Sequence, residues 1–231
     1  MANFKIHLSV ASVGSGLVST ALLGTGIASP KESVTFWAAG TLGGILPDID
    51  SDHSTSVTSI FIALGLILGI LVVFDLARTH SILELWLAFA LTYTAIRYGI
   101  LKIFYKFTVH RGIFHTIVAG LFFGFLSTAL CFQLLSLNSL FSWYIGAFVF
   151  FGYLLHLFLD ELYAINFVEK KIKRSFGTAL GIVDYSNLKT SALITAATAA
   201  IFFATPNIRE FVATVIDKQI FLDIFNNFLP W

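Results

Sequence analysis

The chain has 231 residues, of which 57% are hydrophobic and 12% are charged, and its formal net charge is +1. Water-soluble domains carry about 25% charged residues, so this composition excludes a water-soluble monomer and indicates a protein of the lipid bilayer. The 25 Phe, 7 Tyr and 4 Trp residues exclude an intrinsically disordered chain, and the near-neutral charge gives no sign of nucleic-acid binding.

The first half of the chain contains four hydrophobic segments. Segment 6–30 is long enough for one membrane-spanning helix and is rich in Gly and Ser, as closely packed membrane helices are. A signal peptide is the alternative, but this apolar stretch is longer than a signal usually has. Segment 33–46 is short for a crossing, so it is either a tilted crossing or a re-entrant segment. Segments 54–74 and 81–101 are each long enough to cross.

The longest hydrophobic stretch has no charged residue between Arg111 and Asp160. As one helix it would be about 72 Å long, roughly twice the 30 Å thickness of the hydrocarbon core. Polar residues at 136–142 interrupt the stretch near its middle. The stretch therefore predicts a hairpin of two membrane helices, with both ends on the same side of the bilayer.

The chain ends with a shorter apolar segment, 191–204, and a tail, 207–231. The tail mixes charged residues with regularly spaced Phe and Ile, which is typical of an amphipathic helix lying in the membrane interface. The sequence therefore predicts an all-α, polytopic helical membrane bundle of six to seven membrane segments, one of them short or re-entrant. Residues 1–206 are expected to form a single transmembrane domain, and 207–231 its amphipathic tail.

Histidines and carboxylates gather at the predicted helix ends, and such groups are functional candidates in a bilayer protein because burying them is costly. The first cluster follows Pro47 and contains Asp48, Asp50, Asp52 and His53. One interpretation is a helix cap. The other is a cation site, because neighbouring carboxylates repel one another and a bound cation offsets that repulsion.

Two further clusters stand at the two ends of the predicted hairpin. His110, Arg111 and His115 precede its first helix, and His156 and Asp160 end its second. His156 and Asp160 are four residues apart and share a helix face, so they could bind one ion or form a structural hydrogen bond. Because the hairpin ends on the side where it begins, we expect its two clusters to lie side by side.

A full crossing by segment 33–46 would bring His7 and Asp48 to the same face as the hairpin clusters, and we prefer this arrangement. Most lysines and arginines then fall on that face, including the run at 170–174, whereas Lys31 and Arg78 lie in the opposite loops. The positive-inside rule places the clustered face in the cytoplasm.

Three motifs in order carry a resemblance to a known family: GILPDID at 44–50, HRGIFH at 110–115 and HLFLD at 156–160. With His7, they resemble the YdjM-like family of bacterial inner-membrane proteins, which are predicted to be metal-dependent hydrolases. The resemblance covers roughly 1–161 and implies these metal ligands: His7, Asp48, His110, His115, His156 and Asp160. That family is in turn distantly similar to zinc-dependent phospholipases C and single-strand nucleases. Those enzymes carry more ligands, which puts a full three-metal centre in doubt.

The types of ligand predict the chemistry of the site. Imidazole with carboxylate favours zinc, with manganese or iron as alternatives, and such an ion can activate water toward a phosphoester. Arg111 could bind a phosphate through two hydrogen bonds. Asp50 or Asp52 could act as general base or orient a metal ligand. A site at the bilayer face meets lipid headgroups. We therefore expect a membrane-bound hydrolase of phosphoesters, most plausibly of lipids.

Two other classes of protein fit the same residues. A transporter or channel would use broken helices and polar residues at mid-depth, and 33–47 with its glycines could be such a helix. A noncatalytic membrane scaffold would use the same histidines and aspartates to hold a structural metal ion.

Overall fold

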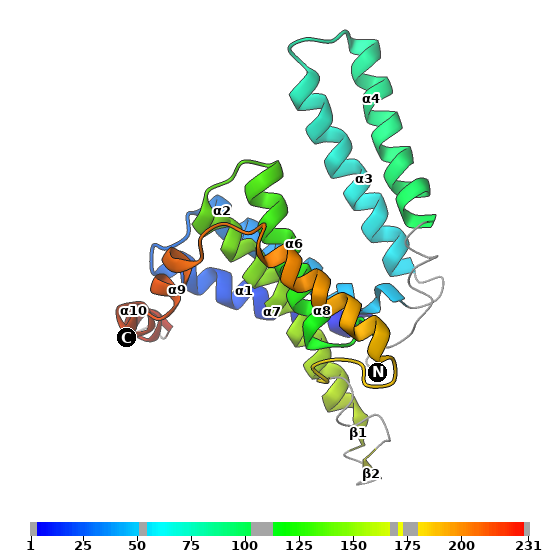
Figure 1. Ribbon diagram of the computed structural model, residues 1–231. Coiled ribbons are helices and arrows are strands. Elements are labelled where there is room, and N and C mark those ends of the chain that lie inside the picture. The colour runs from blue at the N-terminus through cyan, green and yellow to red at the C-terminus, as the bar shows by residue number, and fades with distance from the viewer. Residues whose placement is uncertain (1–3, 51–54, 103–112, 167–170, 173–179, 229–231) are drawn as a thin grey trace. The chain divides into compact units, whose positions relative to one another are not determined.

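The computed structural model describes residues 4–50, 55–102, 113–166, 171–172 and 180–228 (Figure 1). These residues are almost entirely helical, with one pair of two-residue antiparallel strands in which Ile165 pairs with Ile172. In chain order, the elements are α1 (Phe4–Gly24), α2 (Pro30–Gly43), the 3₁₀ helix η1 (Leu46–Asp50), α3 (Thr55–Leu76), α4 (Ile82–Thr94), the π-helix η2 (Ala95–Ile100), α6 (Ile117–Ala129), the π-helix η3 (Leu130–Leu134), α7 (Ser139–Ala164), β1 (Ile165–Asn166), β2 (Lys171–Ile172), α8 (Leu188–Phe202), α9 (Arg209–Val215) and α10 (Lys218–Phe228).

The chain divides into two compact units. The first unit comprises Met1–Pro47 and Gly112–Trp231, and the second comprises Asp48–Arg111. The two units are defined by the contacts within each of them. The prediction that 1–206 form a single transmembrane domain stays a prediction.

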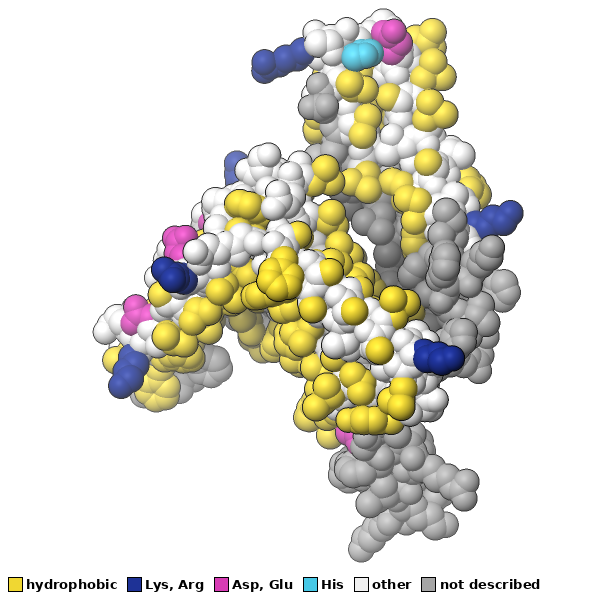
Figure 2. Space-filling model, viewed as in Figure 1, with side chains coloured by type: hydrophobic (Ala, Val, Ile, Leu, Met, Phe, Trp, Pro, Cys, Tyr) yellow, Lys and Arg dark blue, Asp and Glu magenta, His cyan; other side chains and the backbone are white. Residues whose placement is uncertain are grey.

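Several helices have the length and composition of membrane helices. Among the described residues, three helical stretches are long and apolar enough to cross a membrane: Phe4–Gly24, Ile117–Leu134 and Ser139–Ala164. Many large apolar side chains are exposed, and charged ones are sparse on the face that Figure 2 shows. The all-helical architecture, with helices able to cross a membrane, is confirmed, while the count of six to seven membrane segments stays a prediction.

The predicted hairpin is formed by α6 and η3 as one leg and α7 as the other. The legs are antiparallel neighbours, because a side chain at Gly124 would contact Gly146 and one at Gly120 would contact Tyr153. Ser136, in the polar break between them, takes a left-handed backbone conformation with φ of 52°. The polar residues at 136–142 therefore mark the turn, as the sequence predicts.

Helix α7 is the centre of the first unit, where it packs on α1, α2 and α6 (Figure 1). The ring of Phe148, on α7, stacks on the ring of Phe36, on α2, with 5.3 Å between the ring centroids. Tyr153 and Leu157 are fully buried and pack with Ala119 of α6. The buried side of α7 thus contacts α1 and α2, near the beginning of the chain, as well as its hairpin partner α6.

The short helix α2 begins at Pro30 because a capping box precedes it. The Ser29 hydroxyl accepts from the Glu32 backbone N–H, and the Glu32 carboxylate accepts from the Ser29 backbone N–H at 2.8 Å. The Ser29 backbone N–H, followed by its hydroxyl, holds the pKa of Glu32 below its usual value. Segment 33–46 is accordingly observed as α2 followed by η1, and its full crossing stays a prediction.

In the second unit, α3 packs on α4 and η2. Glycines allow the close approach, because a Cβ at Gly69 would lie 2.7 Å from a ring carbon of Phe89. Helix α4 begins at Ile82, where Ser81 and Glu84 form a second capping box. Segments 54–74 and 81–101 therefore form an antiparallel pair of helices, with η2 completing the second.

Helices α2 and α7 cross with their backbones in contact. A Cβ at Gly152 would overlap the carbonyl oxygen of Gly40, and one at Gly43 would overlap that of Val149. Small residues at such a crossing let two membrane helices pack without an intervening side chain. Gly24, at the end of α1, has nothing within 4 Å of the same position and offers a matched control.

We predict that Gly152→Ala destabilises the protein, because the added methyl meets backbone atoms that cannot rotate away. The free energy of unfolding should fall by about 1–3 kcal/mol, the usual cost of overpacking. Gly24→Ala should change it by less than about 0.5 kcal/mol. Thermal unfolding of both variants in detergent micelles measures the difference, and equal stabilities would contradict the backbone contact.

Candidate functional site

Four of the candidate side chains converge in the first unit. His7 lies on the first turn of α1, and His156 and Asp160 lie one turn apart near the end of α7. His115 lies in the turn before α6, next to the N-cap residue Thr116, whose hydroxyl accepts from the Ala119 backbone N–H at 3.2 Å. Residues from three separate parts of the chain thus meet at one end of α7.

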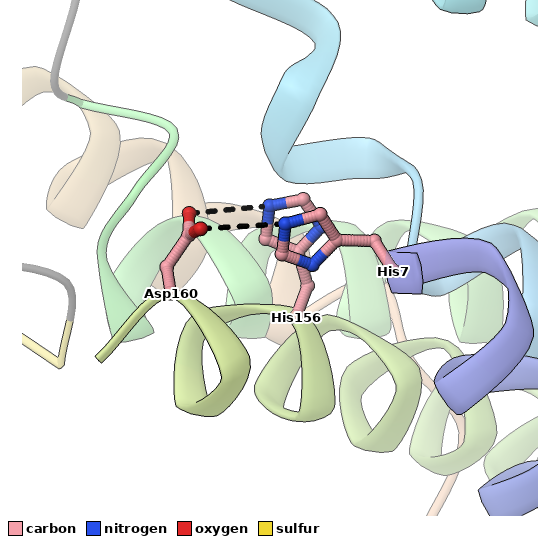
Figure 3. Close-up of side chains that lie close together, drawn as sticks. All are labelled: His7, His156 and Asp160. Carbon is pink, nitrogen blue, oxygen red and sulfur yellow. Dashed lines mark ion pairs between the residues drawn. The ribbon is translucent and has the colours of Figure 1, made fainter. Parts of the chain in front are cut away.

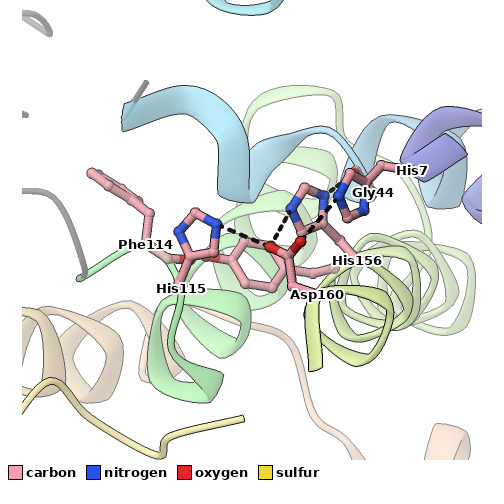
Figure 4. A network of polar contacts seen from close by, with 7 residues as sticks. His7, Gly44, Phe114, His115, His156 and Asp160 are labelled. Carbon is pink, nitrogen blue, oxygen red and sulfur yellow. Dashed lines mark hydrogen bonds and ion pairs between the residues drawn. The ribbon is translucent and has the colours of Figure 1, made fainter. Parts of the chain in front are cut away.

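Asp160 is the centre of the cluster (Figure 3). Its Oδ1 lies 3.3 Å from Nε2 of His7, and its Oδ2 lies 3.6 Å from Nε2 of His156. Nε2 of His115 lies 3.5 Å from Oδ2, so the carboxylate is approached by three imidazoles (Figure 4). The rings of His7 and His156 stack with centroids 3.6 Å apart and an angle of 12° between their planes.

The cluster is shielded from solvent to different degrees. His156 is fully buried, and His7 and Asp160 are 2% and 5% exposed. The side chain of His115 is 15% exposed and is the most accessible of the four. Burying a carboxylate costs several kcal/mol unless it is paired, so the imidazoles, or a cation held by them, must compensate Asp160.

The orientation of His156 is set by a backbone carbonyl. Nδ1 of His156 lies 2.8 Å from the carbonyl oxygen of Gly44, the residue that ends α2 (Figure 4). A carbonyl oxygen can only accept, so Nδ1 carries the proton of this bond. Nε2, the other ring nitrogen, is then the atom that faces Asp160.

A buried tyrosine holds the turn that carries His115. The hydroxyl of Tyr153 on α7 donates to the carbonyl oxygen of Phe114, the residue before His115 (Figure 4). Tyr153 is fully buried and lies three residues before His156, on the same face of α7. Two contacts therefore link the hairpin legs at this end: the Tyr153–Phe114 hydrogen bond and the contact of His115 with Asp160.

Residues Tyr153 and Glu161 were not candidates from the sequence. Glu161 directly follows Asp160 and is 9% exposed. Their sequence signals were weak: Tyr153 stands in an aromatic-rich helix, and Glu161 stands beside an acid that already has a histidine partner at the helical spacing. Burial in the folded chain is what distinguishes both.

The remaining sequence candidates belong to the second unit, Asp48–Arg111. Asp48 lies in η1, four residues after Gly44. Asp50 ends η1, but its side chain is outside the described residues. His110 and Arg111, and also Asp52 and His53, lie outside the described residues altogether. The roles of these residues stay predictions.

The donor atoms of His7, His156 and Asp160 are close enough to bind one ion. One ligand atom from each residue lies within 4.8 Å of the other two. Imidazole nitrogen and carboxylate oxygen are the donors that zinc and other divalent first-row metals accept. The arrangement can also share protons between the imidazoles and the carboxylate.

Removal of the Tyr153 hydroxyl should destabilise the protein, because its partly buried hydrogen bond to the carbonyl oxygen of Phe114 would be lost. We expect Tyr153→Phe to lower the free energy of unfolding by about 1–3 kcal/mol. The matched control is Tyr185→Phe, since Tyr185 is 73% exposed. Thermal unfolding in detergent micelles compares them, and a Tyr153→Phe protein as stable as the control would show that this bond contributes nothing.

Comparison with known protein families matches residues 11–216 to the family described as YdjM inner membrane protein. The matched range contains Asp48, His115, His156 and Asp160, and His7 lies four residues before it. No curated protein matches the chain, and no solved structure matches it. The distant similarity to phospholipases C and nucleases stays a prediction. The family match spans most of the chain, and it agrees with the apolar helices and with the motifs at 44–50, 110–115 and 156–160. The chain therefore belongs to the YdjM inner membrane protein family.

Proposed function

We propose that this protein is a membrane-bound metal-dependent hydrolase whose ion is held by His7, His156 and Asp160. The observation that carries the proposal is the spacing of the donor atoms around Asp160. It builds on two findings: the chain belongs to a family of inner-membrane proteins, and a group of His and Asp side chains lies close enough together to hold a metal ion.

The spacing suits a metal ion better than direct hydrogen bonds. Metal–ligand bonds of about 2.0–2.2 Å in a tetrahedron place neighbouring ligand atoms about 3.3–3.6 Å apart. Nε2 of His7 lies 3.3 Å from Oδ1 of Asp160, and Nε2 of His156 lies 3.6 Å from Oδ2 of the same carboxylate. Charge-assisted hydrogen bonds are shorter, at about 2.7–2.9 Å.

The tautomer of His156 supports the same conclusion. With Nδ1 donating to Gly44, neutral His156 turns a lone pair toward a carboxylate oxygen, and two electron-rich atoms repel each other. A cation between them removes the repulsion. Metal-binding histidines commonly donate their second ring nitrogen to a carbonyl or carboxylate in this way.

Zinc is the preferred ion, with manganese or iron as alternatives, because the donors are imidazole and carboxylate and include no thiolate. Bound there, the ion would supply a Lewis acid that activates water toward a phosphoester. His115, the most accessible imidazole, would face the reacting groups and move a proton. The sequence assigns phosphate binding to Arg111 and a general-base role to Asp50 and adds Asp48 and His110 as further ligands.

The position of the cluster along α7 favours a substrate at the membrane surface. Asp160 lies four residues before the end of a helix that is long enough to cross the bilayer. The end of such a helix lies at the level of the lipid headgroups. We therefore propose a phosphoester of a lipid headgroup as substrate and, from the positive-inside rule, the cytoplasmic face as the side of the reaction.

A noncatalytic scaffold is the second candidate, because two of the ligands are almost fully buried. His7 and His156 are 2% and 0% exposed, and closed sites are typical of structural metal ions. A transporter is less well supported, since the described polar cluster lies at a helix end, and transport sites lie near the midplane.

Metal content tests the site directly. Purified wild-type protein should retain about one zinc ion per chain after dialysis, because three ligands hold it and the Gly44 carbonyl orients one of them, His156. His7→Ala and Asp160→Asn should lose the metal, and His80→Ala, which alters an exposed histidine, should keep it. Elemental analysis gives the ratio; metal content unchanged in both cluster variants would exclude this site.

Activity assays then separate an enzyme from a scaffold. Zinc-loaded protein in mixed micelles should release phosphate-containing headgroups from phospholipids. His115→Ala should lower the rate by about 10- to 100-fold, in the range seen when groups around a metal are removed, and should keep the metal and the fold. Wild-type protein that is stabilised by zinc but hydrolyses no phosphoester would identify the scaffold instead.

A further inference from the structure

Helices α9 and α10 present an apolar surface that no described residue covers. Its side chains are 40–72% exposed and belong to Val212, Val215, Ile216, Phe221 and Phe225. Seven and eleven residues give helices of about 10 and 16 Å, too short to cross a hydrocarbon core of about 30 Å. This surface cannot therefore be the lipid-facing side of a membrane-spanning helix.

The polar residues of α10 lie on one side of the helix. Gln219 and Asp223 are one turn apart, and the Gln219 side chain donates to Asp223 at 3.0 Å. Phe221 and Phe225 form a second row, also one turn apart. The helix is therefore strongly amphipathic, and Figure 2 shows hydrophobic side chains beside a few charged ones at this end of the chain.

The chain before α9 is fastened to the beginning of α7. The Trp143 indole donates to the Pro206 carbonyl at 3.1 Å, and the Ser139 hydroxyl donates to the Asn207 carbonyl at 3.0 Å. Phe211 of α9 stacks on the Trp143 ring with 5.8 Å between the centroids. These contacts place α9 at the first turns of α7.

The path of α8 agrees with this placement. Before α8, the carbonyl of Gly181 accepts from the Ile117 backbone N–H, at the start of α6 beside His115. After α8, the Ala204 carbonyl accepts from the Gln133 side chain, in η3 at the far end of the same leg. The segment from 181 to 204 thus runs alongside α6 from the cluster end to the opposite end.

Helix α7 separates the tail from the His and Asp cluster. Asp160 follows Ser139 by about 21 residues, which is about 31 Å of helix and matches the hydrocarbon thickness. If α7 crosses the membrane, its two ends lie at opposite faces of the bilayer.

We propose that α9 and α10 form an interfacial anchor that lies in the leaflet opposite the His and Asp cluster, with the phospholipid bilayer itself as its partner. The apolar side chains enter the acyl region and the Gln219–Asp223 row faces water, as in other interfacial helices. Phe203, directly after α8, is 87% exposed. The tail is fastened to the first turns of α7, a helix long and apolar enough to cross a membrane, and this position favours lipid over a second copy of the chain. The proposal is independent of metal binding and hydrolysis.

Depth measurements test the orientation of α10. Single cysteines at Phe221→Cys or Gln219→Cys, in full-length protein carrying Cys131→Ala, are labelled with an environment-sensitive dye in phosphatidylcholine–phosphatidylglycerol vesicles. The dye at 221 should lose most of its emission to brominated lipid and little to aqueous iodide, and the dye at 219 should do the reverse. Equal quenching at both positions, or protection of 221 from both quenchers by protein, would overturn the proposal.

Sidedness is tested in cells with the same Gln219→Cys protein and a matched Leu162→Cys protein, whose cysteine lies just beyond Asp160. A membrane-impermeant maleimide added to spheroplasts should label one of the two cysteines, and only lysis should expose the other. Labelling of both from the same side would overturn the opposite-leaflet placement. Loss of zinc or of hydrolysis in other variants would leave this result unchanged, so the two proposals fail separately.

Discussion

The buried carboxylate of Asp160 is the constraint on which the first unit depends. An uncompensated charge in a membrane helix bundle is too costly to persist, so the chain must bring cations or shared protons to it. Three imidazoles from α1, α7 and the turn before α6 meet this need. His7 and His115 thereby hold α1 and the turn before α6 against Asp160, while His156 belongs to the same helix as Asp160. The packing of α1, α6 and α7 at this end is therefore inseparable from the chemistry of the cluster.

Close helix packing is what allows such short side chains to meet. A Cβ at Gly44 would overlap the Cβ of Ala11 on α1, and Gly152 contacts Gly40 of α2 through the backbone. With these small residues, the end of α2 comes near enough to α7 for the Gly44 carbonyl to accept from His156. The glycines and alanines of α1 and α2 thus act on the cluster indirectly, by setting the distances between the helices that carry it.

The sequence predicts most of the cluster, and its limits are physical. A charge-free stretch twice the bilayer thickness predicts the hairpin, and the hairpin places His115 near His156 and Asp160. The four-residue spacing predicts the His156–Asp160 pair. The bonds from His156 to Gly44 and from Tyr153 to Phe114 involve backbone carbonyls, whose directions depend on how the helices cross and leave no pattern in residue types. The short segment 33–46 was ambiguous for a related reason: its glycines suit both a broken helix and the close crossing with α7 that is observed.

Helix α7 connects two regions with opposite relations to the membrane. Its end carries the most deeply buried ionisable groups of the first unit, and its beginning holds an amphipathic tail through Ser139 and Trp143. An anchor in one interface resists vertical movement of the helix it is fastened to, because lifting Phe221 and Phe225 into water or sinking Asp223 into hydrocarbon is unfavourable. Fixing one end of a rigid helix also fixes the depth of the other. In this way the tail would hold the cluster at the level of the headgroups, where a site with its most accessible imidazole at the surface can meet a lipid.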